Sequence, residues 1–563
     1  MTILTMNKKE LEGEIGKVDA AMEKTITDMG TPIEYVNDEE VAVEVFPNRP
    51  DLLSLQNFSL AVNQYRGKAK LASFKIHNTE APKGVHSKEC KDYIVTIEKS
   101  VKKVRPYTVC AIVKGLKFTD EKIKDVIDIQ EKLHNSLGRK RKKAAIGIYP
   151  LEAITLPIKF VAKKPEDIKF RPLEFPRVIN GRQILGQHPA GKEYADLLKD
   201  EDVYPVFIDA NDEILSMPPI INSDKTGRIV ETTKDVFIEC SGHNLYYLNK
   251  IMAIIVASLS RMGGKIYAMK IKDAVEGEKN TPDMTTQEMK FDYKDINRTL
   301  GTDFTDKKIN EYLSKMGIGV ESTGNDPKGP KGAAIVPAYR TDILHWIDLT
   351  EEVAIAHGYD NFEPIIPDIS TIGSEDPRAK TKKVVGNILS GLGLLEVNSF
   401  HICAKDDVKK IHYDFKDFIE LEDSKTARDV LRNDLLTNIM QILYQNSDAS
   451  YPHKIFEVGK VFSLDSNDET GIKETEKLVV AIADEKPSFS DLKQILDYLF
   501  KMLDITYEVR NGEHIGMIKG RCAEVIVEGK VIGHIGEVSP RVLKNWKIKM
   551  PTVALEISLE DLF

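Results

Sequence analysis

The last third of the chain constrains the fold most strongly, because strand-like runs follow one another there at short intervals. Residues 371–563 contain the runs IFEVGKVF, KLVVAIAD, CAEVIVEGKVIGHIGEV and TVALEIS. Three stretches with helical spacing lie at 379–392, 427–445 and 490–503. Apolar runs of this length with many β-branched residues are typical of strands. We therefore predict a domain at 371–563 that is built on an antiparallel sheet.

The whole chain is too long for a single core. Its 563 residues correspond to roughly three to five domains. We expect an α+β multidomain protein. Composition and turn residues divide it into five parts: an N-terminal α/β domain at 1–75, a connector at 76–100, an α+β domain at 101–265, a small compact domain at 275–368 and the last domain at 371–563. The loop NDPKGPKG at 325–332 is expected to be a hairpin wing or an exposed connector.

Composition excludes several classes of protein. The formal net charge of −9 gives no global basic field, so any RNA contact must come from a local patch. The five cysteines are scattered without C-x-x-C spacing, which argues against a disulfide framework or a zinc knuckle. The start has charged residues where a signal peptide needs an apolar run, and the longest apolar stretch, 251–259, is too short to span a membrane. We expect a cytoplasmic protein.

Four carboxylates lie close together in the segment PAYRTDILHWIDLTEEVAIAHGYDNFEP: Asp342, Asp348, Glu351 and Glu352. In a helix over about 344–357 the last three have i, i+3 and i+4 spacing and share one face. An all-oxygen cluster suits a hard cation such as Mg²⁺. Acidic residues in a first helical turn also favour the helix dipole without any metal. The spacing alone leaves both interpretations open.

Six motifs indicate a family. The stretch YRTDI…IDLTEEVAIAHGYDN resembles a segment of the beta subunit of phenylalanyl-tRNA synthetase. Further stretches resemble the archaeal and eukaryotic type of that subunit, in the expected order: VFPNRPDLLS, LGRKRKKAAIGIY, SMPPIINSD, LRNDLL with KIFEVGKVF, and GHIGEVSPRVL. The resemblance implies that Asp342, Asp348, Glu351 and Glu352 are Mg²⁺ ligands within a winged-helix-like, DNA-binding-like domain that does not bind DNA.

The resemblance also implies that the last domain is a degenerate class II synthetase domain. Class II synthetases hold ATP phosphates with arginines, because the guanidinium fork binds phosphate oxygens in pairs. In IFEVGKVF, Phe456 is followed directly by Glu457, and the final strand offers Glu556 without an arginine. Arg432 begins a predicted helix, where we expect an interface or capping role. We predict no aminoacylation residue in this chain and a scaffold role for this domain.

A second activity implied by the resemblance is hydrolysis of Tyr-tRNA(Phe) in the domain at 101–265. The corresponding candidates are Ser216, Asn222, Glu239 and Ser241, with Glu and Ser where archaeal relatives often have Asp and Thr. Strand alternation over VFIECSG places Glu239 and Ser241 on one face and Cys240 on the other. We predict that an ionised Glu239 accepts a hydrogen bond from the tyrosine hydroxyl. Alternatively, Ser216 and Asn222 only fix the Pro-Pro turn.

The densest basic run is Arg139, Lys140, Arg141, Lys142 and Lys143. Such a run is either a solvated face or a contact with tRNA phosphates. Both interpretations stay open at this point.

The predicted function is that of the beta subunit of a phenylalanine–tRNA ligase with two alpha and two beta subunits. The implied partners are the alpha subunit, which binds ATP, and tRNA(Phe), while no DNA and no membrane are expected. The implied cofactor is Mg²⁺. The alternatives are a scaffold subunit without editing activity and a free-standing hydrolase of misacylated tRNA.

Overall fold

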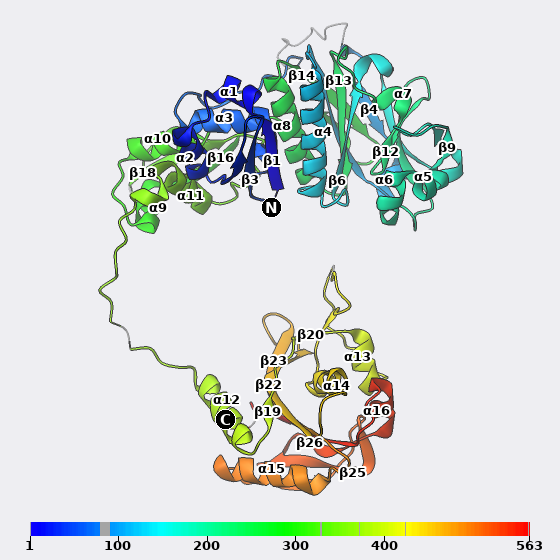
Figure 1. Cartoon of the computed structure of the whole chain (residues 1–563), viewed down its shortest axis with the longest axis vertical. Coiled ribbons are helices and arrows are strands. Elements are labelled where there is room, and N and C mark those ends of the chain that lie inside the picture. The colour runs from blue at the N-terminus through cyan, green and yellow to red at the C-terminus, as the bar shows by residue number, and fades with distance from the viewer. Residues whose placement is uncertain are drawn as a thin grey trace. The chain divides into compact units, whose positions relative to one another are not determined.

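The computed structural model describes residues 2–78, 90–326, 329–370, 372–422, 424–560 and 562 (Figure 1). Its internal packing divides the chain into two compact units, Met1–Ile366 and Pro367–Phe563. Each unit is described by itself below. The finer division into five parts stays a prediction.

The first unit begins with a small antiparallel sheet that three helices cover. The sheet has the order β1-β3-β2, with β1 at Thr2–Asn7, β2 at Ile33–Val36 and β3 at Glu40–Val45. The helices are α1 (Lys8–Ile15), α2 (Ala20–Asp28) and α3 (Leu55–Tyr65). The run VAVEVF at 41–46 supplies most of β3.

The PNRPD turn after β3 is held by an ion pair. Arg49 donates to both carboxylate oxygens of Asp51, at 3.0 and 2.9 Å. The cap of α3 is Ser54, whose hydroxyl accepts from the backbone N–H of Asn57. The Asp51 carboxylate is bound to Arg49 and does not cap α3.

A ten-stranded sheet forms the centre of the first unit, with the order β12-β11-β10-β7-β4-β14-β5-β13-β6 and with β15 paired to β14. Its strands are β4 (Ile94–Ile97), β5 (Tyr107–Lys114), β6 (Ala144–Pro150), β7 (Ile158–Lys163), β10 (Tyr204–Ile208), β11 (Ile214–Met217), β12 (Ile221–Asn222), β13 (Val236–Gly242), β14 (Lys265–Asp273) and β15 (Gly277–Thr281). β4 lies inside the range expected to be a connector, whose residues 79–89 are outside the described residues.

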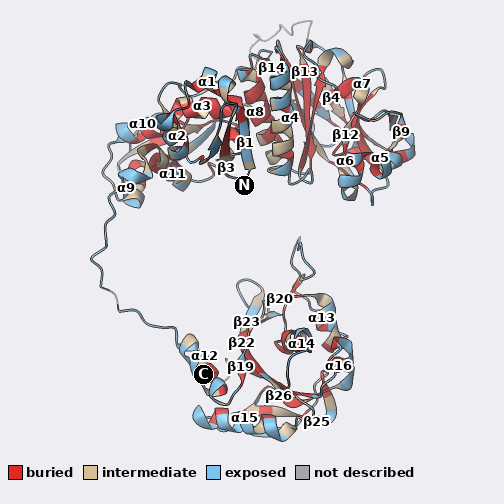
Figure 2. Ribbon diagram, viewed as in Figure 1, coloured by how far each residue is buried: buried red, intermediate tan, exposed pale blue. Residues whose placement is uncertain are grey.

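Helix α8 (Leu245–Arg261) joins this sheet to the N-terminal helices. Every residue from Ile251 to Leu259 is buried, and Figure 2 shows α8 red between the two parts. One hydrophobic cluster includes residues of α8, α3, β5 and β13. The apolar run 251–259 therefore lies in the largest hydrophobic cluster of the unit. Among the described helices, none is long and apolar enough to cross a membrane.

The long helix α4 (Asp120–Asn135) and the short helices α5 (Gly181–Gln187), α6 (Pro189–Glu193) and α7 (Asp224–Gly227) also belong to this part of the unit. The sequence DKTG forms α7. Helix α4 covers β6 with Val126, Ile129 and Leu133 on its buried side. Two small strands, β8 (Lys169–Phe170) and β9 (Ile179–Asn180), pair nearby.

The first unit ends in a three-stranded sheet of order β16-β18-β17 with three helices. The strands are β16 (Gln287–Asp292), β17 (Gly319–Asp326) and β18 (Gly329–Val336), and the helices are α9 (Tyr293–Leu300), α10 (Asp306–Lys315) and α11 (Trp346–His357). β17 and β18 pair as the expected antiparallel hairpin, although residues 327–328 at its tip lie outside the described residues.

The second unit contains a seven-stranded sheet of order β19-β22-β23-β27-β26-β25-β24. Its strands are β19 (Leu395–Glu396), β22 (His453–Leu464), β23 (Ile472–Ala483), β24 (Glu508–Asn511), β25 (Met517–Val527), β26 (Lys530–Val538) and β27 (Thr552–Ser558). All neighbours are antiparallel except β19 and β22, which confirms the predicted antiparallel sheet. Around it lie α12 (Pro377–Gly391), α13 (Lys405–Ile411), α14 (Leu436–Gln445), α15 (Phe489–Met502) and α16 (Pro540–Trp546).

The helix expected over 427–445 is shorter than predicted, because β21 (Val430–Leu431) pairs with β20 (Ile402–Cys403). Arg432 follows β21 and is 1% exposed. Its guanidinium donates to Glu457, 2.7 Å away, to the Ser399 hydroxyl and to the Lys460 carbonyl. The predicted interface or capping role is therefore wrong, and Arg432 belongs to a buried ion pair inside the unit.

We expect Arg432→Met to lower the free energy of unfolding of this unit by about 3–5 kcal/mol. The substitution leaves the Glu457 carboxylate buried without its counter-ion. The matched control is Arg510→Met, because Arg510 pairs with Glu524 at the surface, where such pairs contribute less than about 1 kcal/mol. Thermal unfolding of both variants measures the difference. Equal melting temperatures for the two variants would show that the buried pair has no special weight.

Candidate functional site

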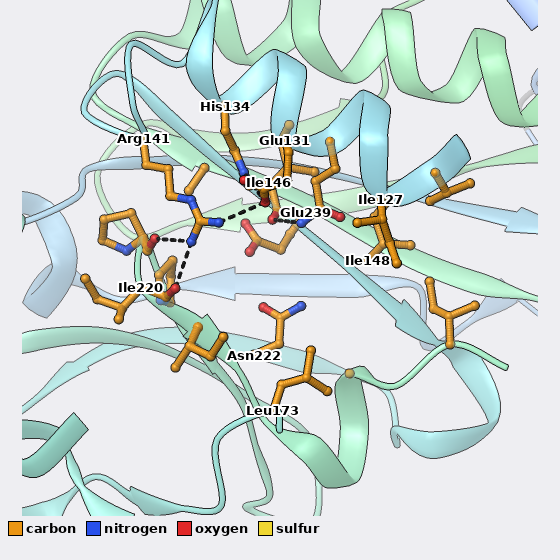
Figure 3. A pocket seen from close by; sticks show the side chains of 18 of the residues that line it. Ile127, Glu131, His134, Arg141, Ile146, Ile148, Leu173, Ile220, Asn222 and Glu239 are labelled. Atoms are coloured by element: carbon orange, nitrogen blue, oxygen red, sulfur yellow. Dashed lines mark hydrogen bonds and ion pairs between the residues drawn. The ribbon is translucent and has the colours of Figure 1, made fainter. Parts of the chain in front are cut away.

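A cavity of about 370 Å³ lies in the first unit, where α4 faces β6 and the turn between β11 and β12 (Figure 3). Much of its wall is isoleucine: Ile123, Ile127, Ile146, Ile148, Ile220, Ile221 and Ile229. Its ionisable and amide groups are Gln130, Glu131, His134, Arg141, Glu174, Asn222, Arg228 and Glu239. Two of the four editing candidates, Glu239 and Asn222, therefore line one cavity. An apolar cavity with a few convergent polar groups is the usual form of a small-ligand site.

Glu239 reaches the cavity from β13, where it lies opposite Gly147 of β6. A Cβ at position 147 would clash with the Tyr149 hydroxyl and lie 2.7 Å from Glu239 Oε1. The missing side chain therefore leaves room for Tyr149. Its hydroxyl donates to Ser216 Oγ at 2.8 Å and lies 3.3 Å from both Asn222 Oδ1 and Glu239 Oε1.

This arrangement brings three of the predicted residues, Ser216, Asn222 and Glu239, around one tyrosine. Sequence reasoning missed Tyr149. The available signal was the alternation in AAIGIYP, which places Gly147 and Tyr149 on one face of β6. Which strand pairs with β6 could not be read from that pattern.

One carboxyl oxygen of Glu239 has no partner. Oε2 is buried and forms no hydrogen bond, while the whole side chain is 1% exposed. Burial raises the pKa of Glu239 to about 8, although the nearby Arg105 guanidinium lowers it. The carboxyl group is therefore mostly protonated at neutral pH. We expected an ionised Glu239, but burial of the carboxyl group favours its neutral form.

Ser241 lies on the same strand, where it lowers the pKa of Glu239 and also binds Arg105. Arg105 donates to the Ser241 hydroxyl at 3.0 Å and to its carbonyl at 2.5 Å. Ser241 is fully buried and is not part of the cavity wall. The structure thus places Ser241 beside Glu239 as an anchor for Arg105, whose pKa burial lowers to about 10.

Helix α4 contributes a second polar group. His134 Nδ1 lies 3.1 Å from Glu131 Oε1, and its Nε2 accepts from the backbone N–H of Ile146 at 2.8 Å. Nδ1 therefore carries the hydrogen and donates to Glu131. Burial lowers the pKa of His134, which keeps the ring neutral. Both nitrogens are occupied, so His134 positions Glu131 and is not available as a base.

Cys240 points to the other face of β13, as predicted. It belongs to the hydrophobic cluster that includes α8, and burial raises the pKa of its thiol well above the usual value. A buried thiol of this kind is a poor nucleophile.

The basic run does not form a single surface. Arg141 is a wall of the cavity: its guanidinium donates to Glu131 Oε1 and to the Ile220 carbonyl, both at 2.8 Å (Figure 3). It also lies 4.4 Å from the centre of the Tyr194 ring. These contacts hold the Arg141 guanidinium in the cavity wall, and a contact of the basic run with tRNA phosphates stays a prediction. Arg139, Lys140 and Lys142 are exposed, and Lys143 is half-buried.

The four carboxylates of α11 and the preceding loop are also separated. Asp348 accepts from the backbone N–H groups of Leu344 and His345, both at 2.7 Å, and so caps the helix. Glu351 is exposed. Among the described residues, no group of three or more His, Cys, Asp or Glu side chains is arranged to hold a metal.

The other two carboxylates share a buried arginine. Arg340 pairs with Asp342 at 2.7 Å and with Glu352 at 2.9 Å. The guanidinium holds the pKa of Asp342 at about 2, whereas burial raises the pKa of Glu352. Glu352 Oε2, buried without a partner, is the one atom here that would suit a cation. As arranged, the four carboxylates do not fit a magnesium ion, because Arg340 and the helix N-terminus hold three of them. The magnesium assignment stays a prediction.

Comparison with known proteins identifies the family. The family described as "Phenylalanyl tRNA synthetase beta chain CLM domain" matches residues 363–559, and "tRNA synthetase B5 domain" matches 289–359. The phenylalanine–tRNA ligase beta subunit of Thermococcus sibiricus is 36% identical over 521 residues, which cover 92% of this chain and 90% of that one. The chain belongs to the phenylalanine–tRNA ligase beta subunit family.

Other members of this beta subunit family support the assignment over the full length. The subunit from Archaeoglobus fulgidus is 34% identical over 570 residues, covering 100% of this chain and 99% of its own. A crystal structure of an N-terminal fragment of the phenylalanyl-tRNA synthetase beta subunit from Pyrococcus horikoshii matches with a TM-score of 0.58 and 31% identity. That match covers 63% of this chain and 99% of the fragment. The resemblance proposed from six motifs is confirmed, as is membership of a ligase of the aminoacyl-tRNA synthetase class.

The raised pKa of Glu239 predicts a pH-dependent stability. In the folded state the carboxyl has a pKa of about 8, against 4.5 as its ordinary value. The stability that comes from burying the neutral acid is therefore complete below about pH 4.5 and is lost as the pH rises through about 8. Glu239→Gln removes this titration. We expect the melting temperature of the wild type, relative to this variant, to fall between those pH values.

The measurement is thermal unfolding of both proteins across that pH range. The control is Glu121→Gln, which makes the same substitution at an exposed position of α4. A difference between wild type and Glu239→Gln that is constant with pH would contradict the assigned protonation state.

Proposed function

We propose that the chain works with an alpha subunit and tRNA(Phe), in an assembly of two alpha and two beta subunits, and hydrolyses Tyr-tRNA(Phe) in the cavity at Glu239. The names of the full-length relatives support the subunit assignment. The observation that carries the hydrolytic site is the buried, unpartnered Oε2 of Glu239, a residue that lines a cavity with both isoleucine and polar walls.

A phenylalanine-specific ligase needs such a site for a physical reason. A hydrophobic pocket rejects an analogue with one added hydroxyl by only about a hundred-fold. A second site that recognises the hydroxyl can remove the error. At that site the tyrosyl ester forms a hydrogen bond through its hydroxyl, and the phenylalanyl ester cannot. Discrimination follows because phenylalanine leaves a polar group of the site without a partner.

The geometry of the cavity fits this task. Its isoleucine walls would contact an aromatic ring, and Glu239 Oε2 would meet the ring hydroxyl. Glu239 Oε1 already faces one phenol, that of Tyr149, at 3.3 Å. The neutral carboxyl can donate to the tyrosine oxygen or accept from it, because a protonated acid offers both functions. Phenylalanine would leave Oε2 unsatisfied, which costs about 1–3 kcal/mol.

Hydrolysis itself would use a water molecule. Water attacks the ester carbonyl carbon, the bond to the ribose oxygen breaks, and the proton passes to that oxygen. Neither Cys240 nor His134 is free to act on the ester, as their burial and hydrogen bonds show. The proposed contribution of the chain is therefore selection and placement of the ester beside a water, without a covalent intermediate.

The test is deacylation of Tyr-tRNA(Phe) by the assembly that carries substitutions at Glu239. We expect Glu239→Ala to reduce the rate by roughly ten- to a hundred-fold, since the variant forms one hydrogen bond fewer to the substrate. Glu239→Gln should retain most of the rate at neutral pH, because an amide replaces a neutral acid. Wild-type rates in the alanine variant would exclude Glu239 as the residue that selects tyrosine.

Tyr149→Phe is the companion variant. It removes the hydroxyl that holds Ser216, Asn222 and Glu239 together and leaves the ring packing unchanged. If Tyr149 positions Glu239, the variant loses rate and the pH profile of deacylation shifts, whereas a residue with a purely structural role would change only the melting temperature.

Amino acid activation is proposed to occur in the alpha subunit, with ATP bound there. In this chain β22 carries Phe456–Glu457 without an arginine, and the guanidinium of Arg432 is occupied by Glu457, Ser399 and Lys460. No free guanidinium fork is left at this strand to hold a phosphate.

We therefore expect the purified single chain to show no phenylalanine-dependent exchange of pyrophosphate into ATP. The assembly with the alpha subunit is the positive control and should show the exchange. Activity in the single chain would overturn the proposed division of labour.

A further inference from the structure

The loop that follows α4 lies between two cavities. Arg139, Lys140 and Arg141 have φ values of 46°, 52° and 64°, so three consecutive non-glycine residues are left-handed. This conformation is unfavourable for residues with a Cβ, because the Cβ comes too close to the following carbonyl oxygen. Backbone bonds hold it, from Lys143 N to the Gly138 carbonyl at 2.9 Å and from Arg141 N to the His134 carbonyl at 3.2 Å.

The unusual backbone directs neighbouring cations to different places. Arg141 lines the cavity at Glu239, whereas Arg139 and Lys143 line a separate cavity of about 470 Å³. We call this second cavity the cationic groove. Besides these two cations, its wall includes Phe46, Pro47 and Tyr247, which come from the turn after β3 and the start of α8.

The charge of the cationic groove is one-sided. Its lining contains no acidic residue, whereas the cavity at Glu239 also includes the carboxylates of Glu131 and Glu174. The groove therefore differs in sign from the chain as a whole, whose net charge is −9. Within the described part of the chain, neither Arg139 nor Lys143 forms an ion pair with an acid. Lys143 Nζ instead lies 4.9 Å from the centre of the Tyr247 ring.

Cations beside exposed rings are the elements of a site for single-stranded nucleic acid, in which the cations contact phosphate and the rings stack on bases. Phe46 is 38% exposed and Tyr247 is half-buried, so both rings present part of their surface. A volume of about 470 Å³ is in the range of small-ligand sites.

We propose that the cationic groove binds one nucleotide unit, with its phosphate on Arg139 and Lys143 and its base on Tyr247. This inference rests on the proposed hydrolytic function and names the part of its substrate that this groove would hold. Two sources share the chemistry: the 3′-terminal nucleotide of an RNA and a free nucleoside monophosphate.

The position of the groove favours the RNA. The scissile ester joins the amino acid to the ribose of the terminal nucleotide, so a nucleotide site must adjoin the hydrolytic cavity. Arg139 and Arg141 line the two cavities and are two residues apart, at most about 7 Å of chain. One loop thus contacts both spaces.

The experiment compares two double variants of the full-length chain in its assembly with the alpha subunit. Arg139→Ala/Lys143→Ala removes the two groove cations. Lys140→Ala/Lys142→Ala removes the same charge from the same loop at exposed positions outside the groove lining. Binding of a labelled RNA hairpin with a single-stranded 3′ end is followed by fluorescence anisotropy as a function of salt, and adenosine monophosphate is titrated as a competitor.

We expect the groove variant to weaken RNA binding and to reduce the salt slope by about one unit for each phosphate that is no longer neutralised, with a smaller effect in the control. Tyr247→Ala should weaken binding by about five-fold or more without changing the slope, because no ring remains for the base to stack on. If adenosine monophosphate competes with the RNA in the wild type and not in the groove variant, the groove also binds mononucleotides. Equal effects of the two double variants, or none, would overturn the proposal.

Hydrolysis of a small tyrosine ester separates this inference from the proposed function. The groove variant should hydrolyse the small ester at the wild-type rate, since that ester carries no nucleotide. If the wild type itself fails to hydrolyse tyrosine esters of any kind, the hydrolytic function fails. The anisotropy result still decides the groove.

Discussion

The pairing of β13 with β6 is the constraint on which the candidate site depends. It sets Glu239 opposite Gly147, where a side chain would clash with the Tyr149 hydroxyl. Both strands are buried on both faces, because α8 covers one side and the Phe237–Tyr149 contact lies on the other. A polar group on such a strand is isolated from water unless the protein supplies partners. Tyr149 is the partner of one carboxyl oxygen, and the other is buried without a partner.

Burial, more than the formal charge, determines the chemistry of the ionisable groups. Glu239 is kept neutral by desolvation, and so is His134. Asp342 remains ionised because Arg340 is beside it. The same type of side chain therefore serves in one place as a neutral hydrogen-bonding group and in another as half of an ion pair. Arg432 and Glu457 repeat the second case in the other unit.

Two arginines have structural contacts that their sequence motifs did not predict. Arg340 neutralises two of four carboxylates that would otherwise repel one another. Arg141 belongs to a basic run, yet its side chain fixes the Pro219–Ile220 turn and Glu131 at the cavity. In both cases the planar, permanently charged fork meets several acceptors at once, which a lysine does not match. The neighbours Arg139 and Lys143 are left for a different partner.

The sequence by itself determined the family, the antiparallel sheet of the second unit and most helices, because these depend on motifs and on local periodicity. It also selected Ser216, Asn222 and Glu239, which the fold brings together. Only the tertiary structure decided that Tyr149 hydrogen-bonds to Ser216 and that Ser241 accepts a hydrogen bond from Arg105. It also decided that Arg141, unlike the rest of the basic run, binds the Ile220 carbonyl at the cavity. The physical reason is that strand pairing and burial are long-range. A residue's partner and its protonation state follow from segments far away in the chain, and local spacing carries no record of them.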